Sequence, residues 1–344
     1  MRLLITTQAV DLDDPVLGFM HRWIVEFSKR CDTVHVICLK EGRHDLPKNV
    51  FVHSLGKETG RSRLKYISRF YRYAFSLRGE YDCVFVHMNS EYVVLGGLFW
   101  RMWEKKIVLW RNHKMRGLLT SVGVRLTNTI CYTSPEAFVA QFAEAVRMPL
   151  GIDTEFFSPG ALPPNSRSIL FLGRLDAVKR VDVFVEALEK LHDQGVEFSA
   201  DIVGDPTDPK SKYAHDVRNL AGPLALEGIV AMHPAVTNEK ARDLFRLHSI
   251  YCNLTPSGSF DKTIGEAMAS GAIVVCANAA VKDALPNKLL AGSGSADAAT
   301  ATLKTALELP ETERRAISEA SRAYVIREHS LSLLTDKLII ALSL

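Results

Sequence analysis

The feature that most constrains the fold of this chain is a repeated alternation between short apolar runs and longer stretches whose apolar residues recur at helical spacing. The short runs include RLLIT, TVHVICL, DCVFVH, KIVLW and TICYT in the first half, and SILFL, SADIV, IVAM, IYCNL and AIVVC in the second. The helical stretches include FMHRWIVEFSKR and PEAFVAQFAEA. Strands that alternate with helices form βαβ units around a parallel sheet, so we predict an α/β protein.

The alternation stops once, at GIDTEFFSPGALPPNSRS, where three prolines and two glycines break any periodicity. Such stretches commonly join domains. We therefore predict a Rossmann-like N-terminal domain over 1–150, a linker over 151–168 and a second Rossmann-like domain over 169–329. A helical pattern over 330–344 is expected to return and pack on the N-terminal domain.

Charge is distributed unevenly, although the formal net charge is only +3. Residues 1–160 contain 22 Lys and Arg against 16 Asp and Glu, whereas the remaining residues contain 20 against 23. The first half is therefore expected to face something anionic.

Cysteines and apolar segments indicate the compartment. Six cysteines lie mostly in apolar runs without a C-x-x-C pair, which predicts buried free thiols in a reducing compartment. The N-terminus lacks the length and cleavage site of a signal peptide. No apolar run approaches the roughly 20 residues of a membrane span. We expect a cytoplasmic protein.

The first group of unusual residues follows the run SILFL, in FLGRLDAVKR. Loops at the carboxyl ends of strands are where open α/β sheets bind ligands. Arg174 follows Gly173 directly, and Lys179 comes just before an amphipathic helix. The N–H groups and dipole of a helix start favour anions, and two cations add charge suited to a phosphate or diphosphate. The alternative is that both cations are solvated loop residues.

The second group is PSGSFDKTIGEAMASG, which follows the run IYCNL. Thr263 and Glu266 match the S/T-x-x-E capping box of a helix start, which gives Glu266 a purely structural interpretation. The functional alternative is that Ser257 to Ser259 let the backbone approach a ligand, while Glu266 accepts hydrogen bonds from sugar or ribose hydroxyls. The motif alone leaves both open.

Together, GR-x4-K after one strand and P-S…E-A-M-A-S-G after a later strand resemble the family 4 glycosyltransferases, retaining enzymes of GT-B fold. The resemblance extends over TTQAVDLDDPVLGFMHRWI, FVHMNSEY, VLWRNH, GIDTEFFSP, FLGRLDAVKRVD, DIVGD and EAMASGAIVV. It implies two Rossmann-like domains with parallel sheets facing across a cleft. The C-terminal domain would bind a nucleotide-diphosphate sugar, and the N-terminal domain an acceptor.

The resemblance also implies roles for single residues of the C-terminal domain. Arg174 and Lys179 would contact the donor diphosphate, and Glu266 the ribose. Further donor-binding positions implied by the resemblance are Gly173, Gly204, Asp205 and, in the segment HPAVT, Val236.

In the N-terminal domain the resemblance implies that Gly18 lies close to the donor phosphate. His113 in WRNH would contact the donor sugar. His87 in FVHMN is the second candidate, and it is also assigned to the acceptor side. The catalytic residues implied are Arg174, Lys179, His113 and Glu266.

One loop departs from the family pattern. The usual pattern has two glutamates eight positions apart, and here Gly258 stands eight positions before Glu266. The loop is similar to an S-F-D-K version carried by a smaller set of members. This implies that Ser259, Phe260, Asp261 and Lys262 lie near the donor sugar. The alternative for Asp261 is an ordinary acid at a helix start.

The expected chemistry is departure of a nucleoside diphosphate from the anomeric carbon. Cations and helix N–H groups aimed at the leaving oxygen would stabilise the transition state, and removing one such donor typically costs ~3 to 4 kcal/mol. Members of the family that the chain resembles are thought to act by same-face attack. Neither a carboxylate pair nor a cofactor is expected.

A metal site is not expected either. Asp11 and Asp13 match the D-x-D of the other major glycosyltransferase fold, but here they follow the first strand. The histidines lack the spacing of a zinc site.

The segment RSRLKYISRFYRYAFSLR, residues 61–78, has six Arg and Lys and no acid. On a helix its apolar residues at 64, 67, 71 and 75 form one stripe. A basic amphipathic helix of this kind, with Arg69 and Arg72, can lie on an anionic membrane. The alternative is an ordinary domain helix whose stripe faces the core, and no nucleic-acid motif accompanies the charge.

These observations predict a retaining glycosyltransferase that moves a sugar to a glycan or lipid-linked acceptor, either free in the cytoplasm or peripheral on the inner membrane face. The rivals are a nucleotide-sugar-binding protein that has lost catalysis, suggested by the missing glutamate, and a GT-B phosphorylase or epimerase. A phosphorylase would require inorganic phosphate.

Overall fold

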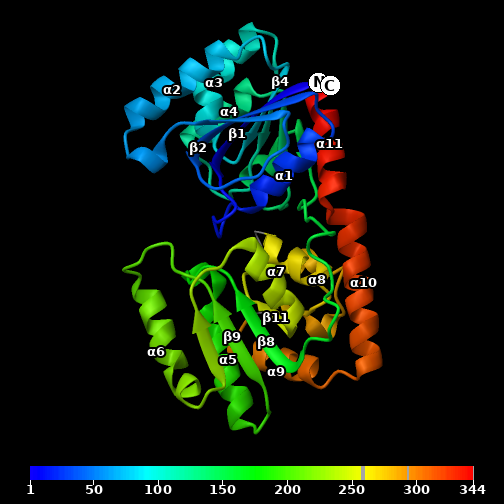
Figure 1. Ribbon diagram of the computed structural model, residues 1–344. Coiled ribbons are helices and arrows are strands. Elements are labelled where there is room, and N and C mark those ends of the chain that lie inside the picture. The colour runs from blue at the N-terminus through cyan, green and yellow to red at the C-terminus, as the bar shows by residue number, and fades with distance from the viewer. Residues whose placement is uncertain (257–259, 293, 344) are drawn as a thin grey trace. The chain divides into compact units, whose positions relative to one another are not determined.

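The computed structural model describes residues 1–256, 260–292 and 294–343. The chain forms two compact units. Unit 1 comprises Met1–Gly151 and Leu331–Leu344, and unit 2 comprises Ile152–Ser330. Figure 1 follows the chain through unit 1, then unit 2, and back to unit 1 with its last helix.

Unit 1 contains a seven-stranded parallel sheet in the order β3-β2-β1-β4-β5-β6-β7. Its strands are short and largely buried because helices cover both faces. They are β1 (Arg2–Val10), β2 (Thr33–Glu41), β3 (Val50–Ser54), β4 (Cys83–His87), β5 (Lys106–Trp110), β6 (Thr129–Tyr132) and β7 (Ala145–Arg147).

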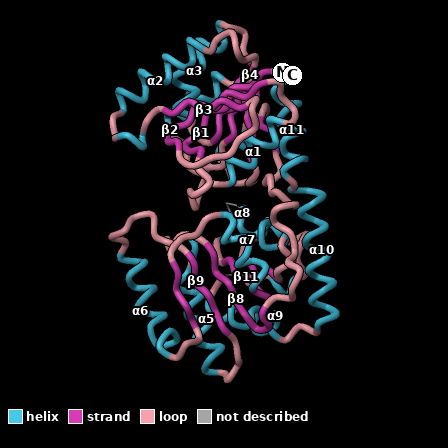
Figure 2. Tube along the Cα trace, viewed as in Figure 1, coloured by secondary structure: helices cyan, strands magenta, loops and turns pink. Residues whose placement is uncertain are grey.

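Helices lie on both faces of this sheet, as the tube view shows (Figure 2). Leu3 and Ile5 of β1 belong to a core with α1 (Phe19–Ser28) and α11 (Leu331–Ser343). Leu4, between them, belongs to a second core with α2 (Arg63–Ser76) and α3 (Ser90–Met102), on which α4 (Leu118–Leu126) packs. Alternate residues of a strand point to opposite faces, so one strand serves both cores.

Helix α11 is held in unit 1 by polar as well as apolar contacts. The guanidinium of Arg30 donates to Asp336 at 2.7 Å and to Ser332 at 2.7 Å. Gly151 adopts φ +72°, and an added Cβ there would lie 2.3 Å from Leu334. A glycine is therefore required where the chain leaves the first pass through unit 1.

Unit 2 contains a five-stranded parallel sheet in the order β10-β9-β8-β11-β12. Its strands are β8 (Asn165–Leu172), β9 (Ser199–Val203), β10 (Val230–His233), β11 (His248–Asn253) and β12 (Ile273–Cys276). Its helices are α5 (Val181–Asp193), α6 (Lys212–Leu226), α7 (Asn238–Leu247), α8 (Lys262–Ala269), α9 (Ala296–Leu307) and α10 (Glu311–His329). Helices α5, α6 and α9 share one core with the sheet, while α7 and α8 contact β11.

The α/β prediction is confirmed, with local differences. PEAFVAQFAEA is not an α-helix; it contains a single 3-10 turn, Phe138–Gln141, and then runs toward β7. Pro135 at its start and the pairing of β7 with β6 favour extended backbone there. The last residues of the 151–168 segment, from Asn165, already belong to β8.

All six cysteines are buried and free, as predicted. Burial in the apolar core raises the pKa of the Cys31 thiol to about 11 and that of Cys131 to about 12, so these thiols are unreactive. None of the described helices has the length and apolar character to cross a membrane.

Candidate functional site

The candidate site of unit 2 is built around Lys179 and Asp261, which are 82 residues apart in the sequence. Lys179 ends a 3-10 turn, Ala177–Lys179, just before α5, and Asp261 is the residue that precedes α8. The ammonium of Lys179 donates to Asp261 Oδ2, and both side chains are largely shielded from solvent, with 14% and 12% exposed. The two loops that the sequence singled out therefore meet at the carboxyl edge of the sheet.

The Asp261 carboxylate is held by two neutral donors as well. Asn253 Nδ2 donates to Oδ2 at 3.1 Å, and Thr255 Oγ1 donates to the same oxygen at 2.9 Å. Asn253 Nδ2 also donates to the hydroxyl of Tyr251 at 3.1 Å, and this hydroxyl lies 2.7 Å from Thr263 Oγ1. A carboxylate with three donors on one oxygen has a fixed orientation.

Arg174 lies nearby but makes different contacts. Its guanidinium donates to Thr207 Oγ1 at 2.9 Å and pairs with Asp176 at 3.0 Å, and 49% of its side chain is exposed. Burial tends to raise the pKa of Asp176, but hydrogen bonds from Thr207 and the cations of Arg174 and Lys179 outweigh it and lower that pKa. The positive charges of Arg174 and Lys179 therefore both stabilise the ionised Asp176 carboxylate.

Two glycines bring the first two loops of this site into contact. Gly204 adopts φ +150°, and an added Cβ would lie 1.9 Å from the carbonyl oxygen of Gly173. Gly173 N donates to Val203 O at 3.0 Å, and Leu175 N donates to Asp205 O at 3.1 Å. Only a glycine at 204 permits this approach.

Asp205 connects the loop after β10 to the other loops of this site. Its carboxylate accepts a hydrogen bond from Ala235 N at 3.0 Å, which fixes the segment after β10 beside the segment after β9. Val236, the next residue, is half-buried. The structure thus places the predicted nucleoside-binding residues together.

Glu266 is not a capping-box acid. Helix α8 begins at Lys262 with Asp261 preceding it, so Thr263 lies inside the first turn and its hydroxyl bonds to Tyr251. A capping box would need Thr263 as the residue before the helix, and Asp261 holds that position instead. The capping-box interpretation is therefore wrong. Glu266 is buried, with 8% exposed.

Lys262 begins α8, a position where the helix dipole disfavours a cation. Burial lowers the pKa of this lysine to about 7, while the Glu266 carboxylate opposes that effect. Phe260, which precedes Asp261, is buried against the ring of His329 at 5.1 Å between centroids. Ser259 lies outside the described residues.

The predicted residues of unit 1 differ widely in exposure. Gly18 immediately precedes α1, and its N–H donates to Asp14 O at 2.9 Å. His87 ends β4 and is buried, with Thr7 Oγ1 at 3.4 Å and the ring of Trp23 at 5.6 Å between centroids. His113 is exposed in the loop after β5.

The two aspartates of the D-x-D sequence form ion pairs with different cations. Asp11 Oδ2 accepts from Lys40 at 2.9 Å, and Asp13 pairs with Arg43 at 2.8 Å. Within the described residues there is no group of three or more histidine, cysteine or acidic side chains suited to a metal ion.

Arg69 and Arg72 of the basic helix α2 make different contacts. Arg69 donates to Leu55 O at 3.1 Å and fills the space above Gly56, where an added Cβ would lie 1.8 Å from its Nη1. Arg72 is exposed and lies over the ring of Tyr73 at 5.1 Å. Arg69 is therefore a structural residue, because its charge is directed at the backbone rather than at solvent.

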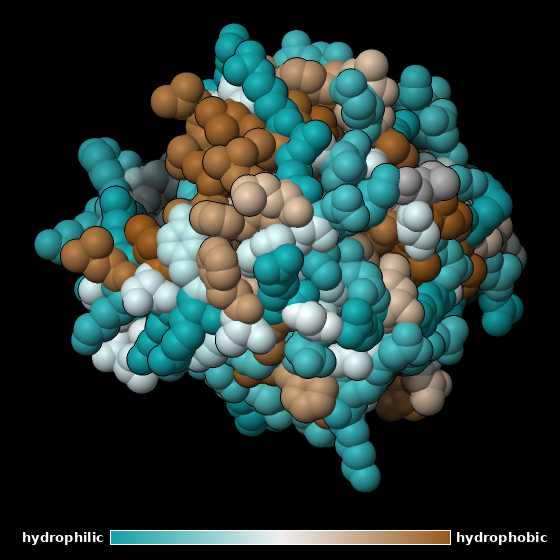
Figure 3. All heavy atoms as spheres, turned by 90° about the horizontal axis from the view of Figure 1, so that it is seen from above, coloured by the Kyte–Doolittle hydropathy of each residue, from teal (hydrophilic) through white to brown (hydrophobic). Residues whose placement is uncertain are grey.

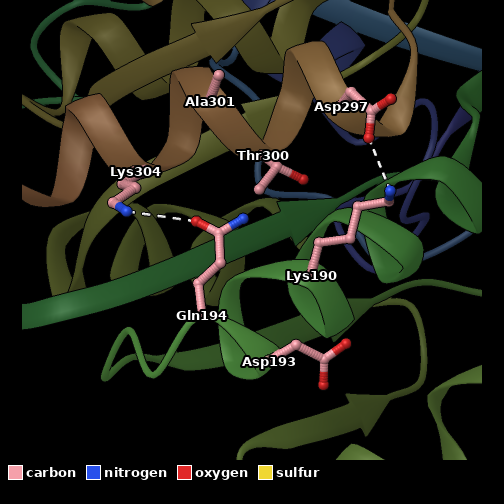
Figure 4. Close-up of a pocket in the computed structure, with 7 residues that line it drawn as sticks. All are labelled: Lys190, Asp193, Gln194, Asp297, Thr300, Ala301 and Lys304. Carbon is pink, nitrogen blue, oxygen red and sulfur yellow. Dashed lines mark hydrogen bonds and ion pairs between the residues drawn. The ribbon is translucent and has the colours of Figure 1, made fainter.

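A separate cavity of about 460 Å³ lies between α5 and α9, shown in Figure 4. Lys190 there pairs with Asp297 at 2.7 Å, and Lys304 donates to Gln194 at 3.3 Å. Both cations are neutralised or hydrogen-bonded by the adjacent helix, and no predicted site residue lines this cavity.

Three residues of the site were not predicted from the sequence: Asn253 and Thr255, which donate to Asp261, and Tyr251, which accepts from Asn253. A signal was present: IYCNLT places polar residues at alternate positions at the end of an apolar strand. Residues at alternate strand positions share a face, so their polar groups converge on one point.

Comparison with known proteins finds a family match over the segment that carries these residues. The family described as "Glycosyl transferases group 1" matches residues 166–308, which contain Arg174, Lys179, Asp261 and Glu266. A D-inositol 3-phosphate glycosyltransferase from Streptomyces griseus is 32% identical over 120 residues, covering 34% of this chain and 25% of the relative. A second relative of that description, from Catenulispora acidiphila, is 28% identical over 193 residues, covering 50% and 45%. The chain thus spans less than half of each relative's length.

Solved structures resemble the whole chain. HepE from Anabaena in complex with UDP and glucose has a TM-score of 0.77 at 16% identity, covering 100% of this chain and 99% of HepE. A sucrose-phosphate synthase from Thermosynechococcus elongatus has a TM-score of 0.76 at 15% identity, covering 98% of each chain. The chain therefore has the fold of the GT-B glycosyltransferases, and its residues 166–308 match the group 1 glycosyl transferases.

Proposed function

We propose that this protein transfers a glycosyl group from a nucleoside diphosphate sugar to a hydroxyl of an acceptor, with retention of anomeric configuration. The observation that carries the proposal is the meeting of Lys179 and Asp261 at the starts of two helices, inside the segment that matches the glycosyl transferase family.

The donor diphosphate would lie against Lys179 and Arg174. A diphosphate has the charge to take the place of Asp261 beside Lys179, and the N–H groups at the start of α5 favour an anion. Arg174 is half exposed and can turn toward a phosphate. The close approach of Gly173 and Gly204 leaves backbone rather than side chain at this position.

The sugar and nucleoside would be bound by the surrounding loops. Asp261 and Glu266 supply carboxylates for hydroxyl groups, and Phe260 and Lys262 are the residues on either side of Asp261. The Asp205 loop and Val236 would border the nucleoside. HepE has been solved with UDP-glucose, which makes a UDP-sugar the first donor to test.

The reaction is balanced without a cofactor. The bond between the anomeric carbon and the β-phosphate oxygen breaks, and the acceptor oxygen bonds to that carbon on the same face. The acceptor proton passes to the departing diphosphate. Lys179 and Arg174 would stabilise the negative charge that grows on the leaving oxygen, where one such donor contributes ~3 to 4 kcal/mol.

The missing first glutamate of the family pattern does not favour loss of catalysis. Asp261 supplies a carboxylate in the variant loop, and the donors Asn253 and Thr255 orient it independently of Lys179. We therefore favour an enzyme over a binding protein.

The test is a thermal-shift comparison of UDP-, GDP- and ADP-sugars with the full chain, followed by nucleoside diphosphate release in the presence of acceptors. Stabilisation by one nucleotide class at millimolar concentration is expected, and it should disappear in the variant Lys179→Ala. Absence of stabilisation by every nucleotide would contradict the proposal. Stabilisation without turnover across polyol phosphate, glycan and lipid-linked acceptors would instead support the binding protein.

A further inference from the structure

Helix α2 presents an apolar stripe to solvent instead of burying it. The side chains buried by this helix are Phe70 and Ala74. The stripe that would face the core in an ordinary domain helix is open at its first two residues, because Leu64 is 81% exposed and Ile67 is 38% exposed. An exposed apolar row on a stable helix commonly marks a binding surface.

An apolar groove of about 510 Å³ runs beside this stripe. It is lined by side chains of α2, α3 and the start of α4, among them Ile67, Tyr66, Leu95 and Leu119. Asn89 and Glu91 line it where α3 follows the carboxyl end of β4. The groove is therefore apolar along most of its wall and polar where an acceptor headgroup would be expected in an α/β sheet.

More exposed apolar residues lie at the start of α4. Leu118 is 81% exposed and Leu119 is 45% exposed. The space-filling view shows hydrophobic side chains gathered in a patch with hydrophilic ones around it (Figure 3). We name the set Arg61, Arg63, Leu64, Lys65, Ile67, Leu118 and Leu119 the α2–α4 face.

Cations predominate among the charged residues at the start of α2, and the acid Glu91 lines the groove with Arg63. Arg61, Arg63 and Lys65 are exposed, and none of them pairs with an acid in the part of the chain that the structure describes. Lys114 and Arg116, just before α4, are also exposed, and residues 105–135 contain no acid. Arg63 itself lines the groove.

We propose that the α2–α4 face docks on an anionic lipid bilayer and that the groove receives an acyl or prenyl chain of a lipid-linked acceptor. This inference rests on the proposed glycosyl transfer, for which it names the acceptor class. Cations without acidic partners match an anionic headgroup layer, and the exposed leucines match the apolar boundary beneath it. An RNA partner would use the cations but would leave the leucines and the groove without a role.

The experiment is flotation of the full chain with two kinds of vesicles, phosphatidylcholine alone and phosphatidylcholine mixed with phosphatidylglycerol. We expect binding to the anionic vesicles only, with loss at high salt. Each cation near the surface contributes about 1 kcal/mol, so the double variant Arg63→Gln with Lys65→Gln should bind about 30-fold more weakly. The matched control, Lys210→Gln with Arg218→Gln, removes two exposed cations of unit 2 and should bind as the native chain does.

The apolar part of the inference has its own variants. Leu64→Ser with Leu118→Ser should lower vesicle binding at least about tenfold, since both side chains would leave the lipid. Leu226→Ser is the control, because Leu226 is 92% exposed on unit 2. Ile67→Glu, which places a charge in the groove, should reduce quenching of protein fluorescence by a spin-labelled phosphatidylglycerol in the same vesicles.

Three results would overturn the inference: equal flotation with neutral vesicles, vesicle binding that is insensitive to the leucine changes, or tighter binding of single-stranded RNA than of anionic vesicles. Thermal shift with UDP-sugars is measured on the same samples. Nucleotide stabilisation that persists without vesicle binding would refute the lipid inference and leave the proposed function standing.

Discussion

The carboxyl ends of the strands are organised differently in the two units. In unit 2 they carry a network in which Asp261 Oδ2 accepts from Lys179, Asn253 and Thr255. In unit 1 His87, at the end of β4, is packed among aromatic rings of α1, and an apolar groove lies among α2, α3 and α4 on the other side of the sheet. A network of satisfied polar groups orients a ligand, whereas an apolar groove mainly buries one. The two units therefore offer different surfaces to the ligands that we propose: fixed polar groups in unit 2 and apolar side chains in unit 1.

The strongest challenge to this contrast is Lys179→Ala. Lys179 is the cation at the centre of the polar network, so its loss should lower kcat/KM with a UDP-sugar by about 100- to 1,000-fold, close to 3 to 4 kcal/mol. Steady-state kinetics with circular dichroism checks this. Lys190→Ala is the control, because Lys190 pairs with Asp297 on the helical layer of the same unit. Similar losses in both variants would remove the special role of Lys179.

The next effect concerns the backbone under the polar network. Gly204→Ala introduces a Cβ 1.9 Å from Gly173 O at φ +150°, so the free energy of unfolding should fall by about 2 to 3 kcal/mol. Gly173→Ala meets only the Phe171 ring at 3.5 Å and should cost less than about 1 kcal/mol. Urea unfolding compares the two. Equal free energies of unfolding for the two variants would show that these loops separate easily. The close contact of Gly204 with Gly173 would then not hold the polar network in place.

The parallel sheets and the loops of the site were predictable because hydrophobic periodicity and helix-start chemistry are local. The face that α2 buries was not predictable. Its sequence offers two apolar stripes, one through Leu64 and Ile67 and another through Phe70 and Ala74, and only packing against α3 selects the second. The capping box failed because the sequence offers two candidate residues before the helix, Asp261 and Thr263, and the helix begins after Asp261, which Lys179, Asn253 and Thr255 hold.

The pH dependence of the free energy of unfolding tests whether Lys262 is buried in the folded protein. Burial lowers its pKa to about 7 from an ordinary 10.5. Between these values the unfolded chain holds a proton that the folded chain has lost, so stability should rise with pH, by at most about 1.4 kcal/mol per unit. Lys262→Gln should flatten this rise in urea unfolding from pH 7 to 10, whereas Lys210→Gln should not. Parallel curves for all three proteins would mean that Lys262 is solvated.

The smallest effect separates the structural from the exposed cations of unit 1. Arg69 donates to Leu55 O and covers Gly56, so Arg69→Gln should lower the free energy of unfolding by about 1 to 2 kcal/mol. Arg72 lies over the ring of Tyr73 at the surface, so Arg72→Gln should change it by less than about 0.5 kcal/mol. Thermal and urea unfolding of both variants decide the point. If Arg72→Gln is the more destabilising change, Arg72 belongs to the packed layer of unit 1. If Arg69→Gln is harmless, the Arg69 charge is available at the surface, and Arg69 joins the α2–α4 face that we assign to lipid.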